Sequence, residues 1–422
     1  MTSADWSSLP CEIVQAIGNR LGAVEDFLAI AAICRSWRSA FSNKKIWNPE
    51  IPRLPLLMLP QSVDGVDNWL QKMPPQSSAE GNLSPLAAAT YFFSSERNKL
   101  YIIDVPEIHG RHCFGSQIGW IFTVNECVLD HEAHLVNPLT RLRILLPPLS
   151  SLKPWFEPNN FVRKAVTFHH RHLDIVVVAI FGYIRHLALA RPGYSTWVPV
   201  ELETPYPCFE DVVCYGGDQI FGVRKDGSLV LCKIDDDDSA TPPKAKAFSF
   251  APALGRQHLQ RVEEVRRKKV YLVESEGDLL LVLRLWRDPP RPPLLTQEVD
   301  VSSFIVFKLN FATREWVELE LQGGFLGNRT LFVGDSYSMS FSARHGLRCQ
   351  PNSIYYSDDL PHWSGLHFNR KARARPQAGG RMVRDMGIFN LEDLTFRFRY
   401  LGVNDARPPF FSPPIWVVPS FN

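Results

Sequence analysis

Two patterns of hydrophobic and polar positions divide the chain into a short helical beginning and a long remainder rich in strands. After Leu9-Pro10, apolar residues recur at the spacing that places them on one helix face: Ile13, Val14, Ile17 and Leu21. Residues 27–33 are apolar almost all round and predict a second, buried helix, and Trp37 with Phe41 marks a third. These roughly 45 residues predict a small all-α module that is too thin to form a large core alone.

From Tyr91 onward, short apolar segments alternate with turns rich in Gly, Asp and Pro, which is the pattern of β-strands joined by hairpins. The clearest strand segments are 212–215, 220–223, 229–231, 270–273 and 279–285. Asp226-Gly227 favours the positive φ angles that a tight hairpin turn requires. We expect an all-β body in which the polar segments 61–88 and 235–261 are loops.

A weak internal repeat predicts the architecture of this body. The turn from Asn137 to Arg141 precedes an apolar strand, and the turn from Asn310 to Arg314 precedes Trp316-Val317 in the same register. Looser copies lie at 190–193 and 389–393, so strand–turn–strand units recur about every 35–55 residues, in the range of propeller blades. The repeat predicts an all-β propeller of six to eight blades, with seven preferred. The alternative is a pair of β-sandwiches whose turns resemble one another by coincidence.

Composition narrows the class of protein. The chain has 422 residues, of which 45% are hydrophobic and 21% charged, and its net charge is +2. This near-neutral balance gives no electrostatic case for nucleic acid or a membrane surface as partner. No apolar run approaches the roughly 18 residues that cross a bilayer, and we expect no secretory signal. The eight cysteines include no Cys-x-x-Cys pair, so we expect reduced thiols in a cytoplasmic and/or nuclear protein.

Candidate catalytic and metal-binding motifs are few. His169-His170-Arg171-His172 is better explained as a hairpin tip than as a metal site, because adjacent residues of a strand face opposite ways. The acidic run 235–238 lacks the alternating ligands and the glycine turn of a calcium loop. The chain contains no nucleophile elbow, zinc-protease motif or dinucleotide fingerprint. We expect no catalytic residue, no metal and no cofactor; an enzyme that uses the propeller's central channel stays open as an alternative.

The N-terminal module resembles an F-box. The residues that carry the resemblance are Leu9, Pro10, Glu12, Ile17, Leu21, Asp26, Cys34, Trp37 and Arg38. The resemblance implies that residues 1–48 bind a Skp-type adaptor, which links to cullin and RING subunits. The residues expected to contact the adaptor, with some of them filling the module's own core, are Leu9, Pro10, Ile13, Ile17, Leu21, Ile33, Trp37 and Arg38. The alternative is a plain three-helix cap packed on the β body.

The body resembles the plant F-box proteins whose C-terminal domain is a kelch-like propeller. The matching segments are 115–120, 137–149, 216–227, 325–343, 351–359, 385–389 and 413–416. The resemblance implies a small all-α F-box module followed by an all-β propeller over residues 49–422. It also implies the substrate-recognition subunit of an SCF-type E3 ubiquitin ligase, which holds an unknown client protein and performs no bond chemistry itself.

A basic stretch is the candidate client-binding site: Arg370, Lys371, Arg373 and Arg375. Propellers bind mainly through loops at one face, and this stretch is a loop candidate. A second basic cluster lies at 266–269. The simplest explanation of these charges is a solvated loop and a strand entrance; a nuclear-import signal is a further alternative. Residues 29–32 are apolar where F-boxes commonly carry a basic or polar residue, which motivates a further alternative: a propeller scaffold or binding protein without ligase coupling.

Overall fold

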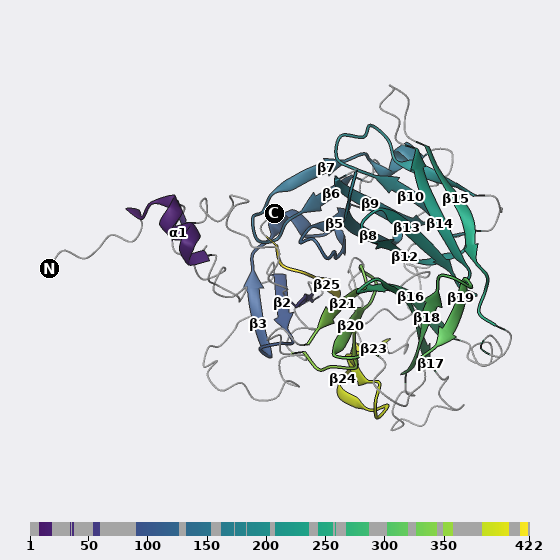
Figure 1. The fold of residues 1–422 in the computed structure, drawn as a ribbon. Coiled ribbons are helices and arrows are strands. Elements are labelled where there is room, and N and C mark those ends of the chain that lie inside the picture. The colour runs from purple at the N-terminus through teal and green to yellow at the C-terminus, as the bar shows by residue number, and fades with distance from the viewer. Residues whose placement is uncertain are drawn as a thin grey trace.

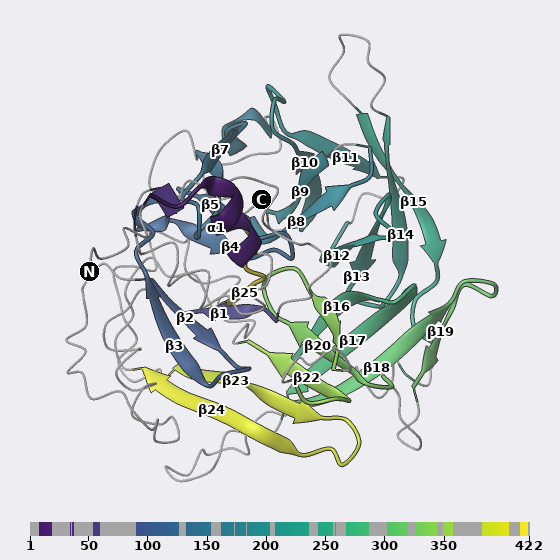
Figure 2. The same cartoon turned by 60° about the vertical axis from the view of Figure 1, so that its left-hand side comes forward.

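The computed structural model contains β-sheets arranged around a common centre, with little helix (Figures 1 and 2). The residues that the structure describes are 8–18, 34, 36–37, 54–59, 90–125, 132–152, 162–172, 174–182, 184–202, 207–235, 244–255, 258, 267–286, 302–319, 326–343, 349–357, 382–404 and 414–420. Within them the helices are α1 (Cys11–Gly18) and the short 3-10 turns η2 (Pro106–Ile108) and η3 (Leu149–Leu152). No helix in these ranges is long and apolar enough to span a membrane.

Five sheets are formed by the described strands. The first contains β25 (Ile415–Val417), β1 (Leu56–Met58), β2 (Thr90–Ser94) and β3 (Lys99–Ile103). The second contains β4 (His112–Phe114), β5 (Ile121–Val124), β6 (Ala133–Val136) and β7 (Arg143–Leu146). The third, of eight strands, contains β12 (Phe209–Tyr215), β13 (Gln219–Arg224), β14 (Leu229–Asp235), β15 (Lys244–Ala251), β11 (Val198–Leu202), β10 (His186–Ala190), β9 (Asp174–Phe181) and β8 (Val162–His170).

The fourth sheet contains β16 (Arg267–Ser275), β17 (Asp278–Trp286), β18 (Ser302–Asn310) and β19 (Glu315–Glu318). The fifth contains β21 (Met339–Ser342), β20 (Arg329–Val333), β22 (Ser353–Tyr356), β23 (Met382–Asn390) and β24 (Phe396–Asn404). The eight-stranded sheet consists of two antiparallel four-stranded units that a parallel pairing of β11 with β15 joins. This arrangement is an all-β propeller, as the repeat predicts, and not a pair of sandwiches. The number of blades stays a prediction.

The ring closes where the two ends of the body meet in one sheet. β25 pairs antiparallel with β1, with Leu57 opposite Trp416. Strands from opposite ends of the body thereby share one ladder, which leaves fewer exposed sheet edges. Gly115, just after β4, approaches this closure so closely that a Cβ there would lie 1.9 Å from the carbonyl oxygen of Trp416.

The repeated turn of the sequence has the same geometry in three sheets. Asn137 Oδ1 accepts hydrogen bonds from the backbone N–H groups two and three residues ahead, at 3.0 and 3.1 Å. Asn310 and Asn390 do the same between β18 and β19 and between β23 and β24. Arg141 and Arg314 then adopt a positive φ, of 61° and 58°. The side-chain amide therefore fixes an equivalent outer turn in each sheet, and the predicted hairpins 212–231 and 270–285 form as β12-β13-β14 and β16-β17.

One predicted loop is wrong in part. We expected a loop at 235–261, yet β15 occupies Lys244–Ala251. Ala245 and Ala247 are buried while Lys244 and Lys246 are exposed, so the period of two is present. Because alanine is a small and weakly strand-forming residue, the alternation is hard to recognise in the sequence. The predicted loop 61–88 lies outside the described residues.

The hydrophobic core lies between neighbouring sheets. Phe122 of β5 contacts Trp197, just before β11, with ring centroids 5.9 Å apart. On the other side of the ring, Phe304 of β18 and Phe389 of β23 lie 5.2 Å apart. Such contacts between adjacent sheets hold the ring rigid, so the inner strands can present side chains at fixed positions near the centre.

Candidate functional site

The predicted adaptor-docking residues at the N-terminus differ in exposure. α1 follows Leu9-Pro10 directly, and the backbone N–H groups of Ile13 and Val14 donate to the Pro10 carbonyl at 3.0 and 3.2 Å. Pro10 is exposed and Ile13 is 49% exposed, whereas Val14 is 1% exposed. Leu9 and Ile17 are half-buried. The first turn of the helix therefore leaves apolar surface available to a partner, and Val14 packs inward.

The other predicted site residues are buried or lie outside the described ranges. Trp37 is 5% exposed, so in this structure it packs within the protein. Leu21, Ile33 and Arg38 lie outside the described residues, as does the whole basic stretch from Arg370 to Arg375. The predicted F-box module and the predicted client loop thus stay predictions.

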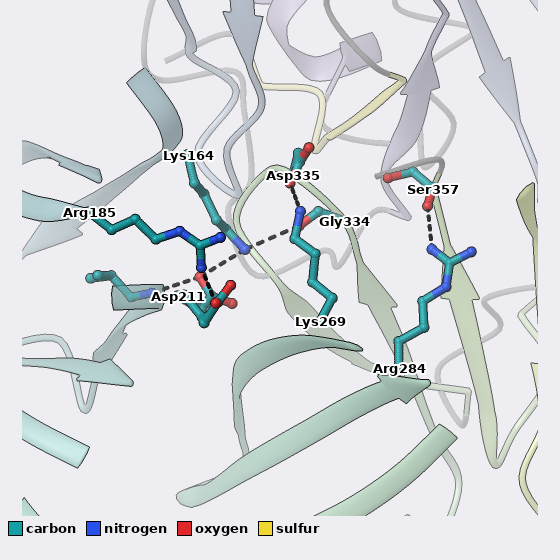
Figure 3. A network of polar contacts seen from close by, with 10 residues as sticks. Lys164, Arg185, Asp211, Lys269, Arg284, Gly334, Asp335 and Ser357 are labelled. Atoms are coloured by element: carbon teal, nitrogen blue, oxygen red, sulfur yellow. Dashed lines mark hydrogen bonds and ion pairs between the residues drawn. The ribbon is translucent and has the colours of Figure 1, made fainter. Parts of the chain in front are cut away.

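A polar network that the sequence did not predict lies near the centre of the propeller (Figure 3). Lys164, Asp211 and Lys269 are each the third residue of their strand, in β8, β12 and β16. Lys164 Nζ lies 2.8 Å from Asp211 Oδ1, and it donates to the carbonyl of Gly334 at 3.1 Å. One ammonium thereby connects β8 with β12 and with the segment after β20.

The carboxylate of Asp211 is buried and accepts contacts from three donors. The backbone N–H groups of Val212 and Leu272 donate to its two carboxylate oxygens at 2.7 and 2.9 Å, and Lys164 supplies the third contact. Both charged side chains are almost inaccessible, Lys164 at 3% and Asp211 at 0% exposure. Burial raises the pKa of Asp211, and the Lys164 ammonium and the backbone donors oppose that shift. The pair ties three elements together at the centre of the ring.

The segment after β20 completes this network. Lys269 forms an ion pair with Asp335, and the backbone N–H of Trp416 donates to Ser336 Oγ at 3.1 Å. A Cβ on Gly334 would lie 2.0 Å from Ser357 Oγ, so only glycine fits there without displacement of a neighbour. The turn is thus held against both β16 and the closing strand β25.

A fully buried arginine lies directly opposite Lys269 in the ladder of β16 with β17. Arg284 of β17 lies between the rings of Trp286 and Tyr356, whose centroids are 4.6 and 4.3 Å from its guanidinium carbon. Its Nη1 donates to the Ser357 carbonyl at 2.9 Å, as Figure 3 shows. Stacking on two aromatic faces and a hydrogen bond compensate the burial of this charge.

A pocket opens beside the network, where β8, β12 and β16 begin and where β9 ends. Five cationic side chains line it: Arg163, Lys164, Arg185, Lys268 and Lys269. Two carboxylates join them, Glu210 and Asp335, and Ile180 and Phe209 supply apolar surface. Arg185 forms an ion pair with Glu210. The lining is therefore strongly cationic in a chain whose net charge is only +2.

The histidine cluster lies at the opposite ends of the strands. His169 and His170 end β8, and His172 follows in the turn. His170 Nε2 lies 3.0 Å from the Asp218 carbonyl, and His169 Nδ1 lies 3.3 Å from Asp174. In the described part of the chain, no group of three or more His, Cys, Asp or Glu residues is placed to hold a metal ion.

Comparison with known proteins identifies the propeller. The sequence pattern of the KIB1-4 beta-propeller family matches residues 92–390, well over half of the chain. The chain belongs to the KIB1-4 beta-propeller family. F-box protein At2g26160 of Arabidopsis thaliana is 33% identical over 379 residues, covering 85% of this chain and 97% of that protein. F-box protein SKIP23 of the same plant is 24% identical over 463 residues, covering 98% of this chain and 95% of that protein.

The pocket of this KIB1-4 beta-propeller and the contacts of Lys164 and Asp211 lie inside the matched segment, whereas Trp416, which donates to Ser336, lies beyond it. The sequence carries a signal for them: β8, β12 and β16 each have charged residues at their second and third positions and apolar residues directly after. Of these charges only those of 266–269 form a contiguous basic run, and the structure places its Lys268 and Lys269 at the beginning of β16. The signal in β8 and β12 is two charged residues inside an otherwise apolar strand, which a search for contiguous basic runs overlooks.

Proposed function

We propose that this protein is the substrate-recognition subunit of an SCF-type E3 ubiquitin ligase. Relatives named F-box proteins that align over almost the whole chain carry the proposal. The alignment with SKIP23 covers 98% of the chain, so it extends beyond the propeller to the predicted F-box module. The Leu-Pro pair before α1 and the matching residues up to Arg38 support the same assignment.

In this proposal the two parts have separate roles. Residues 1–48 dock on a Skp-type adaptor through the apolar surface of Leu9, Pro10 and Ile13, since helix-in-groove contacts bury such surface. The kelch-like propeller holds a client protein near the ubiquitin-loaded E2. The receptor itself breaks and forms no bond; its contribution is proximity, which supplies a large share of a rate enhancement.

We further infer that the propeller has six blades, at the lower end of the predicted range. Four antiparallel four-stranded units support this count, β4–β7, β8–β11, β12–β15 and β16–β19. The sheet closed by β25 and the sheet of β20–β24 complete the ring.

Direct binding to the adaptor tests the proposed function. The full chain is co-expressed with an affinity-tagged Skp-type adaptor, beside a Leu9→Ala/Pro10→Ala variant and a Leu145→Ala control. Leu145 is an exposed leucine of the propeller, far from α1 in the sequence. We expect the unmutated chain and the control to retain the adaptor and the double variant to lose it, while the tryptophan fluorescence of the propeller is unchanged. Equal adaptor recovery with all three chains would show that the N-terminal module is a structural cap.

A further inference from the structure

The cationic pocket at the beginning of β8, β12 and β16 is the feature that the proposed function leaves unexplained. Its lining has five cationic and two anionic side chains, and Asp211 pairs with Lys164 from behind the lining, so the excess is two positive charges. The whole chain of 422 residues also has an excess of two, so this one small region holds as much net positive charge as the entire protein.

Several of these cations are held in place and partly removed from water. Lys164 is fixed by Asp211 and Gly334, Lys269 by Asp335, and Arg185 by Glu210. Their side chains are 3%, 12% and 28% exposed. Charges near a low-dielectric wall interact more strongly with a ligand than charges in open solvent do, and fixed side chains lose little entropy when a ligand binds.

The composition of the pocket matches a single anionic group on a chain with apolar flanks. Arg163 and Arg185 bring guanidinium groups, which match phosphate and carboxylate oxygens in a planar, bidentate geometry. Phe209 and Ile180 add an apolar wall beside them. Recognition of phosphorylated or acidic motifs by clustered arginines is a recurring mode of peptide binding. A nucleic acid would instead require a basic stripe along the surface and a basic domain.

We propose that this pocket binds an anionic side chain, phosphate or carboxylate, within an acidic peptide segment of the client. The assignment of the peptide to a client rests on the proposed function. The pocket lies where β8, β12 and β16 begin, so its side chains are carried by strands that the packed sheets hold in place. The incoming anion joins the cations that Glu210 and Asp335 already orient.

Fluorescence anisotropy with three labelled peptides tests the proposal. The peptides are decamers of Gly, Ser and Leu, with Leu on both sides of the central position, and they differ only at that position, which is phosphoserine, glutamate or serine. The full chain is compared with an Arg163→Gln/Lys268→Gln variant. A matched Arg171→Gln/Lys308→Gln control removes the same charge from the far ends of β8 and β18.

We expect the phosphoserine peptide to bind the unmutated chain and the control equally, and the pocket variant at least tenfold more weakly, with affinity falling as salt rises. A much weaker glutamate peptide identifies phosphate as the recognised group, and equal binding of both identifies any acidic side chain. Equal binding of the serine peptide, or equal loss in the control variant, overturns the proposal. Adaptor binding, measured on the same variants, fails or succeeds independently and reports on the ligase assignment alone.

Discussion

The buried pair of Lys164 and Asp211 provides the sharpest test of how the propeller centre is held together. Lys164→Met removes the ammonium and leaves a carboxylate that is 0% exposed with only its two backbone donors. Asp211→Asn removes the negative charge in an isosteric way and leaves Lys164 with the Gly334 carbonyl. The double variant removes both charges together. The three variants form a double-mutant cycle on one contact.

The expected magnitudes follow from burial. Loss of one partner of a buried ion pair costs about 3–5 kcal/mol, because the remaining charge stays desolvated without its counterion. After Asp211→Asn one backbone N–H still donates to the amide oxygen, but the other meets the amide NH2, so the double variant should lose about 1–3 kcal/mol. We therefore expect each single variant to lose about 3 kcal/mol of unfolding free energy or more. The coupling energy between the two positions should then be about 3 kcal/mol or more.

The chain offers a matched control pair at its surface. Lys308 Nζ also lies 2.8 Å from Asp278 Oδ1, but these side chains are 46% and 44% exposed. Solvent screening limits such a pair to about 0.2–1 kcal/mol. The same cycle with Lys308→Met and Asp278→Asn, in urea unfolding followed by tryptophan fluorescence, should give a coupling energy several times smaller than that of the buried pair.

The pH dependence of Lys164→Met adds a second readout. Burial raises the pKa of Asp211, and the variant loses the ammonium that opposes the shift. A carboxyl whose pKa is higher in the folded than in the unfolded state binds protons preferentially in the folded state, so stability rises as pH falls. The loss of unfolding free energy in Lys164→Met, relative to the unmutated chain, should therefore become smaller as the pH falls from 7 to 5. Additive single effects, or equal coupling in the buried and the surface pair, would refute this account of the centre.

Three further perturbations have defined outcomes. Gly115→Ala should lose about 1–3 kcal/mol of urea stability, because its Cβ would meet the Trp416 carbonyl at 1.9 Å, whereas Gly255→Ala, 3.8 Å from its nearest neighbour, should change little. Arg284→Lys should lower urea stability by about 1–3 kcal/mol, because an ammonium cannot stack on two rings; an unchanged midpoint would contradict the stacking. Burial lowers the pKa of His134 to about 4, so stability should be complete above pH 6.5 and decline by up to about 3 kcal/mol as pH falls to about 4. His134→Gln, titrated in parallel, should lack this decline.

Local features of the fold were predictable because their causes lie close together in the sequence. The turn from Asn137 to Arg141 depends on an amide that accepts bonds from residues two and three positions ahead. The hairpin around Asp226-Gly227 depends on a glycine with φ of 85°. Both signals act within five residues, so the sequence predicted the strands, the turns and the repeat that identifies a propeller.

The centre of the propeller was not predictable in the same way. The contact of Asp211 with Leu272 joins residues 61 positions apart, and that of Lys164 with Gly334 joins residues 170 apart. These residues come together only when the ring of sheets closes. A local sequence pattern therefore cannot predict which charged residues form pairs. The sequence instead predicts a site at 370–375, because a contiguous basic run can be recognised in a sequence. Charged residues that lie on separate strands and meet only in the folded protein cannot be recognised in this way.

The measurement that tests the central claim most directly is affinity purification of the full chain from plant extract with the proteasome blocked. The unmutated chain is compared with the Leu9→Ala/Pro10→Ala variant. The account predicts that Skp-type adaptor and cullin co-purify with the unmutated chain and are lost from the variant, while candidate clients stay with both. Recovery of neither adaptor nor cullin with the unmutated chain would contradict it and leave a propeller that binds its partners outside a ubiquitin ligase.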